Sequence, residues 1–169
     1  MARTIGIVAF QGDVERHAHA LGDLGLQSRR VREASELRGI DGIVIPGGES
    51  TTIGMLMERW GLLDALRDAL AAGLPALGTC AGAILLAARL SEYARLAGRP
   101  QPTLGLMDIT VQRNAYGRQV DSFEEALDWD GPAETAVFIR APRVLSCGPD
   151  VEVLARVEGD PVLLRQARL

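Results

Sequence analysis

Cys80 is the residue whose type and setting most directly indicate chemistry in this chain. It stands at the centre of the pentapeptide Gly-Thr-Cys-Ala-Gly at positions 78–82, between the apolar run Leu74–Leu77 and the helix-like run Ala83–Ala88. A nucleophile at the tip of a sharp strand-to-helix turn needs small neighbours, because bulky side chains would clash where the backbone reverses. The positive end of the following helix would also favour the thiolate. The pattern predicts thiol chemistry, with a buried structural cysteine as the alternative.

A second small-residue loop, Pro46–Thr52, contains the consecutive glycines Gly47 and Gly48. It follows an apolar strand and precedes a helix, so its backbone N–H groups can face a ligand. It lacks the Gly-Lys-Ser/Thr ending of a P-loop, and by itself a plain strand-to-helix connection explains it equally well. Loops at the carboxyl ends of parallel strands converge on one crevice. The N–H groups of Ala81 and of Gly47 or Gly48 would then form an oxyanion hole beside Cys80, which predicts acyl transfer through a thioester.

Strand-like and helix-like segments alternate through the first half of the chain and would position these loops. The segments are a strand at Thr4–Phe10, a helix at Asp13–Leu24, a strand near Leu26–Val31, a helical turn at Ala34–Leu37, a strand at Gly42–Ile45, helices from about Thr52 and over Leu62–Ala71, and the strand that leads to Cys80. This alternation indicates parallel strands with helices on both faces of the sheet.

After Pro100 the strand-like segments are separated by turns rather than by helices. They are Leu104–Val111, Val120–Trp129, Ala136–Ile139, Val151–Val157 and Val162–Leu164. We therefore expect a single α/β domain, residues 1–169, in which one mixed sheet carries an antiparallel extension.

The composition excludes several classes of protein. A chain of 169 residues can bury one core, and its 4% aromatic content requires that core to be mainly aliphatic. A net charge of −4 gives no electrostatic reason to expect nucleic acid or an anionic membrane as a partner. The two cysteines, Cys80 and Cys147, form no CxxC or Cys/His cluster, which argues against a disulfide framework and a zinc site. No run is long and apolar enough for a signal peptide or membrane helix, so we expect a soluble, cytoplasmic protein.

Four motifs in order along the chain resemble one known family. They are Pro46–Thr52, the elbow at 78–82, the run Gln112–Phe123 and the run Phe138–Pro142. Together they are similar to the PdxT family, the glutaminase subunits of pyridoxal 5′-phosphate synthase, which belong to the class I, triad-type glutamine amidotransferases. The resemblance implies a three-layer, flavodoxin-like α/β fold with a mixed, mostly parallel sheet and an antiparallel extension.

The resemblance also implies roles for individual residues. Cys80 would attack the side-chain amide of L-glutamine, release ammonia and leave a glutamyl thioester that water hydrolyses to glutamate. Gly47 and Ala81 would form the oxyanion hole. The substrate-binding residues implied by the matching motifs are Gly48, Glu49, Ser50, Arg113, Ile139 and Arg140.

A partner is implied as well. A PdxS-type synthase subunit would receive the ammonia within a hetero-oligomer, so this chain itself would need no metal and no bound cofactor. The first predicted helix and the preceding Gln11 and Gly12 would lie near that interface. Four charged residues are expected to be solvated or to contact the partner rather than to join the site: Arg118, Asp121, Glu124 and Glu125. Cys147 is expected to be a structural residue of a turn or of the core.

A thiol nucleophile of this kind needs a base that a third group orients. The PdxT family supplies both from a His-Pro-Glu segment near its C-terminus, and no such tripeptide occurs in this sequence. The only histidines are His17 and His19, two apart on the first predicted helix and therefore on different faces. We expect a surface or partner-facing role for both, and we expect the His-Pro-Glu segment to follow Leu169 in the complete protein.

Two other functions stay open from the sequence. One is a non-catalytic subunit that binds glutamine or the synthase without a general base. The other is a different cysteine hydrolase with the same nucleophile elbow, acting on another carbonyl. Mass spectrometry of the native protein tests the first alternative, and release of glutamate from glutamine, with and without a synthase partner, tests the second.

Overall fold

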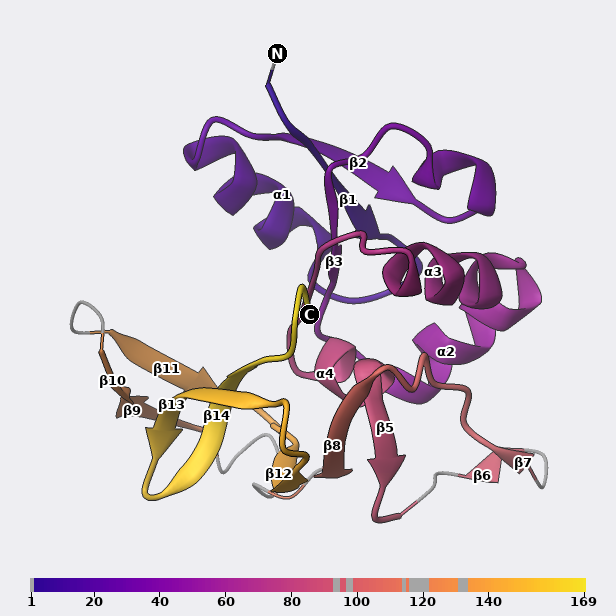
Figure 1. The fold of residues 1–169 in the computed structure, drawn as a ribbon. Helices are drawn as coiled ribbons and strands as arrows, with labels where there is room; N and C mark the ends of the chain where they lie inside the picture. The colour runs from indigo at the N-terminus through magenta and orange to yellow at the C-terminus, as the bar shows by residue number, and fades with distance from the viewer. Residues whose placement is uncertain (1, 93–94, 97–98, 114, 116–121, 131–133) are drawn as a thin grey trace.

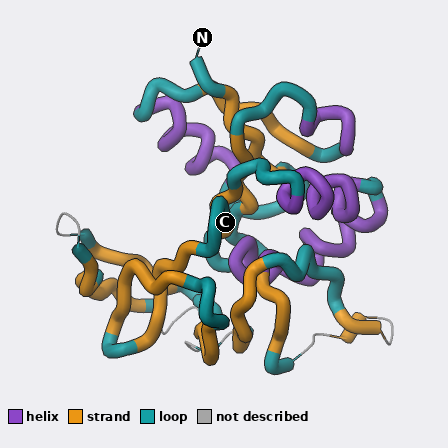
Figure 2. The backbone as a smooth tube through the Cα atoms, in the orientation of Figure 1, coloured by secondary structure: helices purple, strands orange, loops and turns teal. Residues whose placement is uncertain are grey.

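The computed structural model of the protein describes residues 2–92, 95–96, 99–113, 115, 122–130 and 134–169. Strands and helices alternate in the first part of the chain, whereas the last part consists of strands and turns, as the tube in Figure 2 shows. The last helix of the described residues, Ala81–Leu86, directly follows Cys80 in the cysteine elbow. The predicted change from alternating strands and helices to strands alone is therefore confirmed, although it comes before Pro100.

The early strands form a parallel sheet in the order β2-β1-β3-β4. The strands are β1 (Thr4–Val8), β2 (Gln27–Val31), β3 (Gly42–Ile45) and β4 (Ala76–Gly78). β1 runs between β2 and β3, pairing Ile5 with both Ser28 and Gly42, and β3 pairs with β4 from Ile43↔Ala76 to Ile45↔Gly78. Every residue of β3 is buried, as a continuous apolar run in a covered parallel strand requires.

Helices cover both faces of this sheet (Figure 1). They are α1 (Val14–Asp23), the 3₁₀ turn η1 (Ala34–Leu37), α2 (Ser50–Arg59), α3 (Leu62–Ala71) and α4 (Ala81–Leu86). Figure 1 places α1 on one side of the strands and α2 and α3 on the other. Leu62, Leu66 and Leu70 follow one another at a spacing of four on α3 and are buried, each contributing about 1.5–3 kcal/mol by burial. α1 has no fully buried residue.

Short strands make up the rest of the chain. β5 (Ala87–Leu90) pairs in parallel with β8 (Met107–Gln112), and β12 (Arg143–Cys147) pairs antiparallel with β8. The remaining pairs are antiparallel: β6 (Arg95–Leu96) with β7 (Arg99–Pro100), β9 (Phe123–Ala126) with β11 (Thr135–Phe138), and β13 (Glu152–Val157) with β10 (Asp128–Trp129) and β14 (Asp160–Arg165). This region corresponds to the predicted antiparallel extension, although among the described residues its strands form sheets separate from the β2-β1-β3-β4 sheet.

Several elements differ from the sequence expectations. The helix after Cys80 ends at Leu86 rather than Ala88, because the carbonyls of Leu85 and Leu86 accept hydrogen bonds from residues 104 and 106. The predicted strand Val120–Trp129 is divided into β9 and β10, and its first two residues lie outside the described part of the chain. β12 escaped prediction because its polar residues interrupt the apolar pattern.

In the part of the chain that the structure describes, no helix is both long and apolar enough to cross a membrane.

Candidate active site

The cysteine elbow has the sharp geometry that its sequence predicts. β4 ends at Gly78, α4 begins at Ala81, and Cys80 between them has φ 50° and ψ −101°. A positive φ is unfavourable for a residue with a side chain and persists only where the surroundings enforce it. The glycines are required sterically, because a Cβ on Gly82 would lie 2.0 Å from the Ile45 carbonyl oxygen.

The Cys80 thiol is half-buried and faces two backbone N–H groups. Burial raises the pKa of the thiol above its ordinary value, hydrogen bonds from the N–H groups of Ala81 and Gly48 partly offset this, and the nearby charge of Glu49 raises it further. The N–H of Ala81 at the start of α4 thus favours the thiolate, as expected, but burial outweighs it and the net pKa of the thiol is raised. α4 has six residues, and its field does not outweigh the loss of solvation.

The glycine loop between β3 and α2 is held by residues that follow β1. The Glu49 N–H donates to the Gln11 side-chain oxygen at 2.8 Å, and the Asp13 N–H donates to the Gly47 carbonyl at 3.3 Å. Gly12 and the loop are in such close contact that a Cβ on Gly12 would lie 1.8 Å from the Gly47 oxygen. Two loops that are distant in the sequence thus form one wall of the site.

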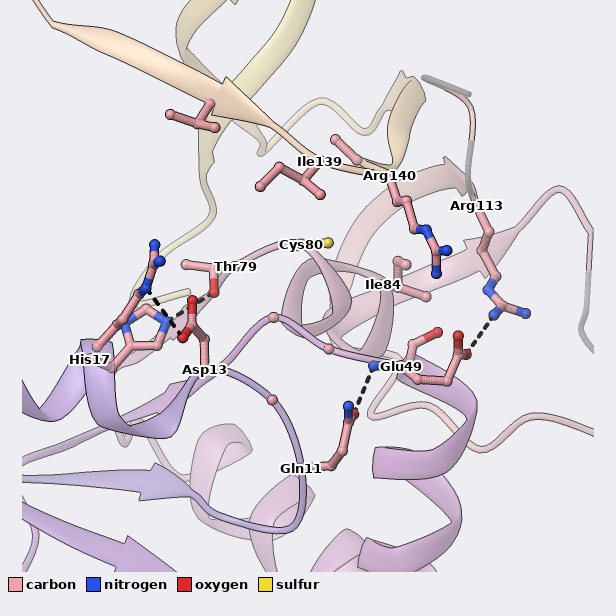
Figure 3. Close-up of a pocket in the computed structure, with 17 residues that line it drawn as sticks. Gln11, Asp13, His17, Glu49, Thr79, Cys80, Ile84, Arg113, Ile139 and Arg140 are labelled. Carbon is pink, nitrogen blue, oxygen red and sulfur yellow. Dashed lines mark hydrogen bonds and ion pairs between the residues drawn. The ribbon is translucent and has the colours of Figure 1, made fainter. Parts of the chain in front are cut away.

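Both loops open into one pocket of about 660 Å³, shown in Figure 3. Every predicted site residue except Ala81 lines it: Cys80, Gly47, Gly48, Glu49, Ser50, Arg113, Ile139 and Arg140. Ala81 is fully buried and reaches the site through its N–H. Five further lining residues, which the sequence analysis did not assign to the site, come from the segment after β1: Gln11, Gly12, Asp13, Arg16 and His17.

Arg113 supplies positive charge at one end of the pocket, directly after β8. Its guanidinium forms an ion pair with Glu49 at 2.9 Å, and the Arg113 side chain is only 14% exposed. Its Nε is buried without a hydrogen-bond partner among the described residues. Glu49 also accepts a hydrogen bond from the Thr51 N–H, which caps α2. The pair therefore fixes Arg113 while leaving donor capacity for an anionic group.

His17 is half-buried and lines the pocket, so it does not lie on the open surface; a partner-facing role, the other part of the expectation, stays a prediction. The Nε2 of His17 is 3.1 Å from the Thr79 hydroxyl oxygen, and burial lowers the pKa of its imidazole although the charge of Asp13 raises it. His19 is 83% exposed, as expected, and lies 3.6 Å from Asp23. A sequence signal for His17 existed, because it follows Val14 by three residues and so lies on the apolar face of the helix.

The remaining predicted residues lie outside the site or outside the described chain. Glu124 and Glu125 are exposed on β9, whereas Arg118 and Asp121 belong to the part of the chain that the structure does not describe. Cys147 is half-buried in β12 and packs against the core. Among the described residues, no group of three or more His, Cys, Asp or Glu side chains is arranged to hold a metal ion.

The chain is similar to known glutamine amidotransferases along nearly its whole length. A model of the SNO glutamine amidotransferase family matches residues 7–169. The chain is 52% identical over 171 residues to pyridoxal 5′-phosphate synthase subunit PdxT of Mycolicibacterium vanbaalenii, covering 99% of this chain and 87% of that protein. It is 55% identical over 169 residues to the subunit of the same name from Frankia alni, covering 98% and 82%. A crystal structure of a glutamine amidotransferase matches with a TM-score of 0.88 and 46% identity, covering 97% and 85%.

Proposed function

The chain belongs to the SNO glutamine amidotransferase family, and we propose that it is the glutaminase subunit of a pyridoxal 5′-phosphate synthase, with L-glutamine bound in the pocket at Cys80. One observation carries the proposal: the Cys80 thiol, the N–H groups of Ala81 and Gly48, and the guanidinium of Arg113 converge on a single pocket. A nucleophile, donors for an oxyanion and a cation for a carboxylate are what hydrolysis of an amino-acid side-chain amide requires.

The charged side chains at the pocket would determine the orientation in which glutamine binds. Among the described residues, the buried Nε of Arg113 has no hydrogen-bond partner, and the guanidinium would bind the α-carboxylate. Glu49 would accept from the α-ammonium group, which places the carboxamide toward Cys80. Ser50 is 2% exposed and its hydroxyl is turned to Gln101, so we assign its contact with glutamine to the backbone. Gly48 lines the same wall.

Ile139 and Arg140 complete the far wall of the pocket after β11. Arg140 has φ 50°, and in Figure 3 its side chain extends toward the space between Cys80 and Arg113. A second cation at this position would add to the attraction for a carboxylate. Ile139 would contact the aliphatic part of glutamine.

In the proposed reaction, the sulfur of Cys80 attacks the carboxamide carbon and the carbonyl oxygen becomes an oxyanion. The N–H groups of Ala81 and Gly48, which already face the sulfur, would stabilise that charge. Gly47 stays a predicted member of the oxyanion hole. The C–N bond then breaks, the amide nitrogen takes a proton and leaves as ammonia, and water hydrolyses the glutamyl thioester to glutamate.

The thiol needs a base, because burial raises its pKa and keeps the proton on the sulfur at neutral pH. Among the described residues, the hydrogen-bonding groups at the sulfur are backbone N–H donors, which cannot accept that proton. The proposal therefore requires a base other than these groups to take the proton from Cys80. The chain spans 82–87% of the length of the PdxT relatives described above.

The partner we propose is a PdxS-type synthase subunit, which would use the ammonia in a hetero-oligomer. The name of the relatives, pyridoxal 5′-phosphate synthase subunit PdxT, supports this assignment. α1 is the proposed contact surface, because none of its residues is fully buried and its first turn borders the active-site pocket. The cytoplasmic location and the absence of a bound cofactor stay predictions.

The interface assignment can be tested on Glu15, which pairs with Arg30 on β2. Glu15→Arg should weaken stimulation of glutaminase activity by the synthase, because it reverses a charge on the proposed surface. Arg30→Ala removes the same ion pair without reversing the charge of α1 and serves as the control. Equal stimulation of Glu15→Arg and wild type would place the interface elsewhere.

The activity itself is tested by glutamate release from L-glutamine, measured on the complete protein with a synthase partner. Cys80→Ala should abolish release while leaving partner binding intact, and Cys147→Ser should retain it. Activity that survives in Cys80→Ala would move the nucleophile to another residue. No release by the wild-type protein with a synthase partner would refute the glutaminase assignment and leave a non-catalytic subunit or a cysteine hydrolase of another carbonyl as the function.

A further inference from the structure

The contact between His17 and Thr79 joins α1 to the cysteine elbow. The Nε2 of His17 lies 3.1 Å from the Thr79 hydroxyl oxygen, in a half-buried position. Figure 3 shows the imidazole beside Thr79, with Thr79 between His17 and the sulfur of Cys80. The hydrogen-bond partner of His17 is thus the residue that precedes the nucleophile.

Thr79 is held from three directions. Its N–H donates to the Ile45 carbonyl at 3.1 Å, and its own carbonyl accepts from the Gly82 N–H at 2.8 Å. These bonds attach it to β3 and to α4, and the side-chain bond attaches it to α1. Such fixation matters because Cys80 has a positive φ, a conformation that costs about 1–3 kcal/mol and needs support from its surroundings.

The same segment of the chain also holds the other side of the oxyanion hole. One turn before His17, the Asp13 N–H is bonded to the Gly47 carbonyl, and the Gln11 side chain accepts from Glu49. The start of α1 therefore touches both the glycine loop and the elbow. A helix turn is a rigid spacer, so these contacts set the distance between the two loops.

We propose that His17 is a positioning residue of the glutaminase reaction: through Thr79 it fixes the elbow against the start of α1, so that the N–H groups of Ala81 and Gly48 point at one oxygen. His17 does not serve as the base in this account. The inference rests on the proposed function, because the oxyanion is that of a glutamine carboxamide. The alignment of the two N–H groups on the Cys80 sulfur can be tested separately, by an assay that does not require hydrolysis of glutamine.

The His17 side chain can be replaced without changing the net charge of the pocket. Burial lowers the pKa of His17, so its imidazole is neutral at neutral pH, although Asp13 acts in the opposite direction. Replacement by leucine then removes the hydrogen bond without removing a charge. The charged groups that share the pocket, namely Asp13, Arg16, Glu49, Arg113 and Arg140, stay in place.

The first test measures alkylation of the Cys80 thiol by iodoacetamide against pH, in a Cys147→Ser background. Loss of alignment weakens the N–H bonds that favour the thiolate. His17→Leu and Thr79→Val should therefore raise the midpoint and slow alkylation at neutral pH by about threefold to tenfold. His17→Gln and Thr79→Ser, which keep a hydrogen-bonding atom, should restore the rate. His19→Leu, on the same helix, is the matched control and should react like wild type.

A double-mutant cycle separates positioning from general loosening of the fold. If the two residues act through one bond, His17→Leu combined with Thr79→Val should react no more slowly than either single variant. Effects that multiply in the double variant would overturn the proposal. So would a wild-type alkylation profile in His17→Leu, or a His17→Gln variant as slow as His17→Leu.

The second test measures turnover of glutamine by the complete protein with a synthase partner. His17→Leu should lower kcat about tenfold with KM within about twofold of wild type, because the misaligned donors act in the transition state. A raised KM with unchanged kcat contradicts the positioning role. If wild type releases no glutamate, the proposed function is refuted, while the alkylation series still decides whether His17 aligns the elbow.

Discussion

Replacement of Gly12 by alanine tests whether the segment after β1 sets the position of the oxyanion loop. Gly12 has φ 100°, and an added Cβ would lie 1.8 Å from the Gly47 carbonyl oxygen. Real Cβ contacts are essentially never shorter than 3.0 Å, so Gly12 and Gly47 must separate by roughly 1 Å. Gly47 belongs to the backbone beside Gly48, whose N–H faces the Cys80 sulfur. The substitution therefore moves one donor of the oxyanion hole without touching the nucleophile.

A displacement of about 1 Å at a catalytic group costs on the order of 100-fold in rate, or about 2.7 kcal/mol of transition-state stabilisation. We expect Gly12→Ala to lower kcat by that factor, measured as glutamate release per folded molecule. Gly25→Ala is the matched control, because Gly25 also has a positive φ of 71° but nothing lies within 4 Å of an added Cβ. Both variants carry the backbone penalty of about 1–2 kcal/mol, and only Gly12→Ala should lose catalysis. A Gly12→Ala enzyme as fast as Gly25→Ala would refute the reasoning.

Three further predictions follow from the charges at the site. Arg113→Met should weaken binding of L-glutamine to the Cys80→Ala protein at least tenfold by titration calorimetry, because the α-carboxylate loses its cation; unchanged affinity would contradict this placement. The raised pKa of Cys80 means that its contribution to stability is present below the unfolded pKa and is lost as the pH rises through the folded one. Cys80→Ala should accordingly reduce the alkaline loss of stability in denaturant titrations, and an identical pH dependence in both proteins would argue against a buried thiol. The imidazole of His17 should titrate below the ordinary range of histidine by NMR, because burial lowers the pKa of His17; a midpoint at or above that range would be inconsistent with its burial.

The parts of the site that were predictable from the sequence are those encoded by short segments. The elbow at Cys80 and the loop at Gly48 require small residues at fixed positions, and that requirement is visible in the sequence itself. The alternation of apolar runs and amphipathic helices indicated parallel strands, whose carboxyl ends converge. The assignment of Glu49 and Arg113 to one site came from the family resemblance, because the two residues are 64 positions apart.

The parts that escaped prediction depend on tertiary packing. The side chain of His17 meets Thr79 across 62 residues, and only the rotation of α1 against the elbow determines that contact. The net pKa of Cys80 was not predictable, because the sequence shows the helix that follows but not the burial that outweighs its field. The early end of α4 also depends on tertiary contacts, since its last carbonyls accept hydrogen bonds from the N–H groups of residues 104 and 106.

The most direct test of the account is to label the protein with an electrophilic diazoketone analogue of glutamine and to locate the adduct by peptide mass spectrometry. We predict a single adduct on the peptide that contains Cys80, prevented by excess L-glutamine and absent from Cys80→Ala. An adduct on Cys147, or labelling of Cys80 that glutamine does not slow, would contradict the assignment of this pocket as the glutaminase site.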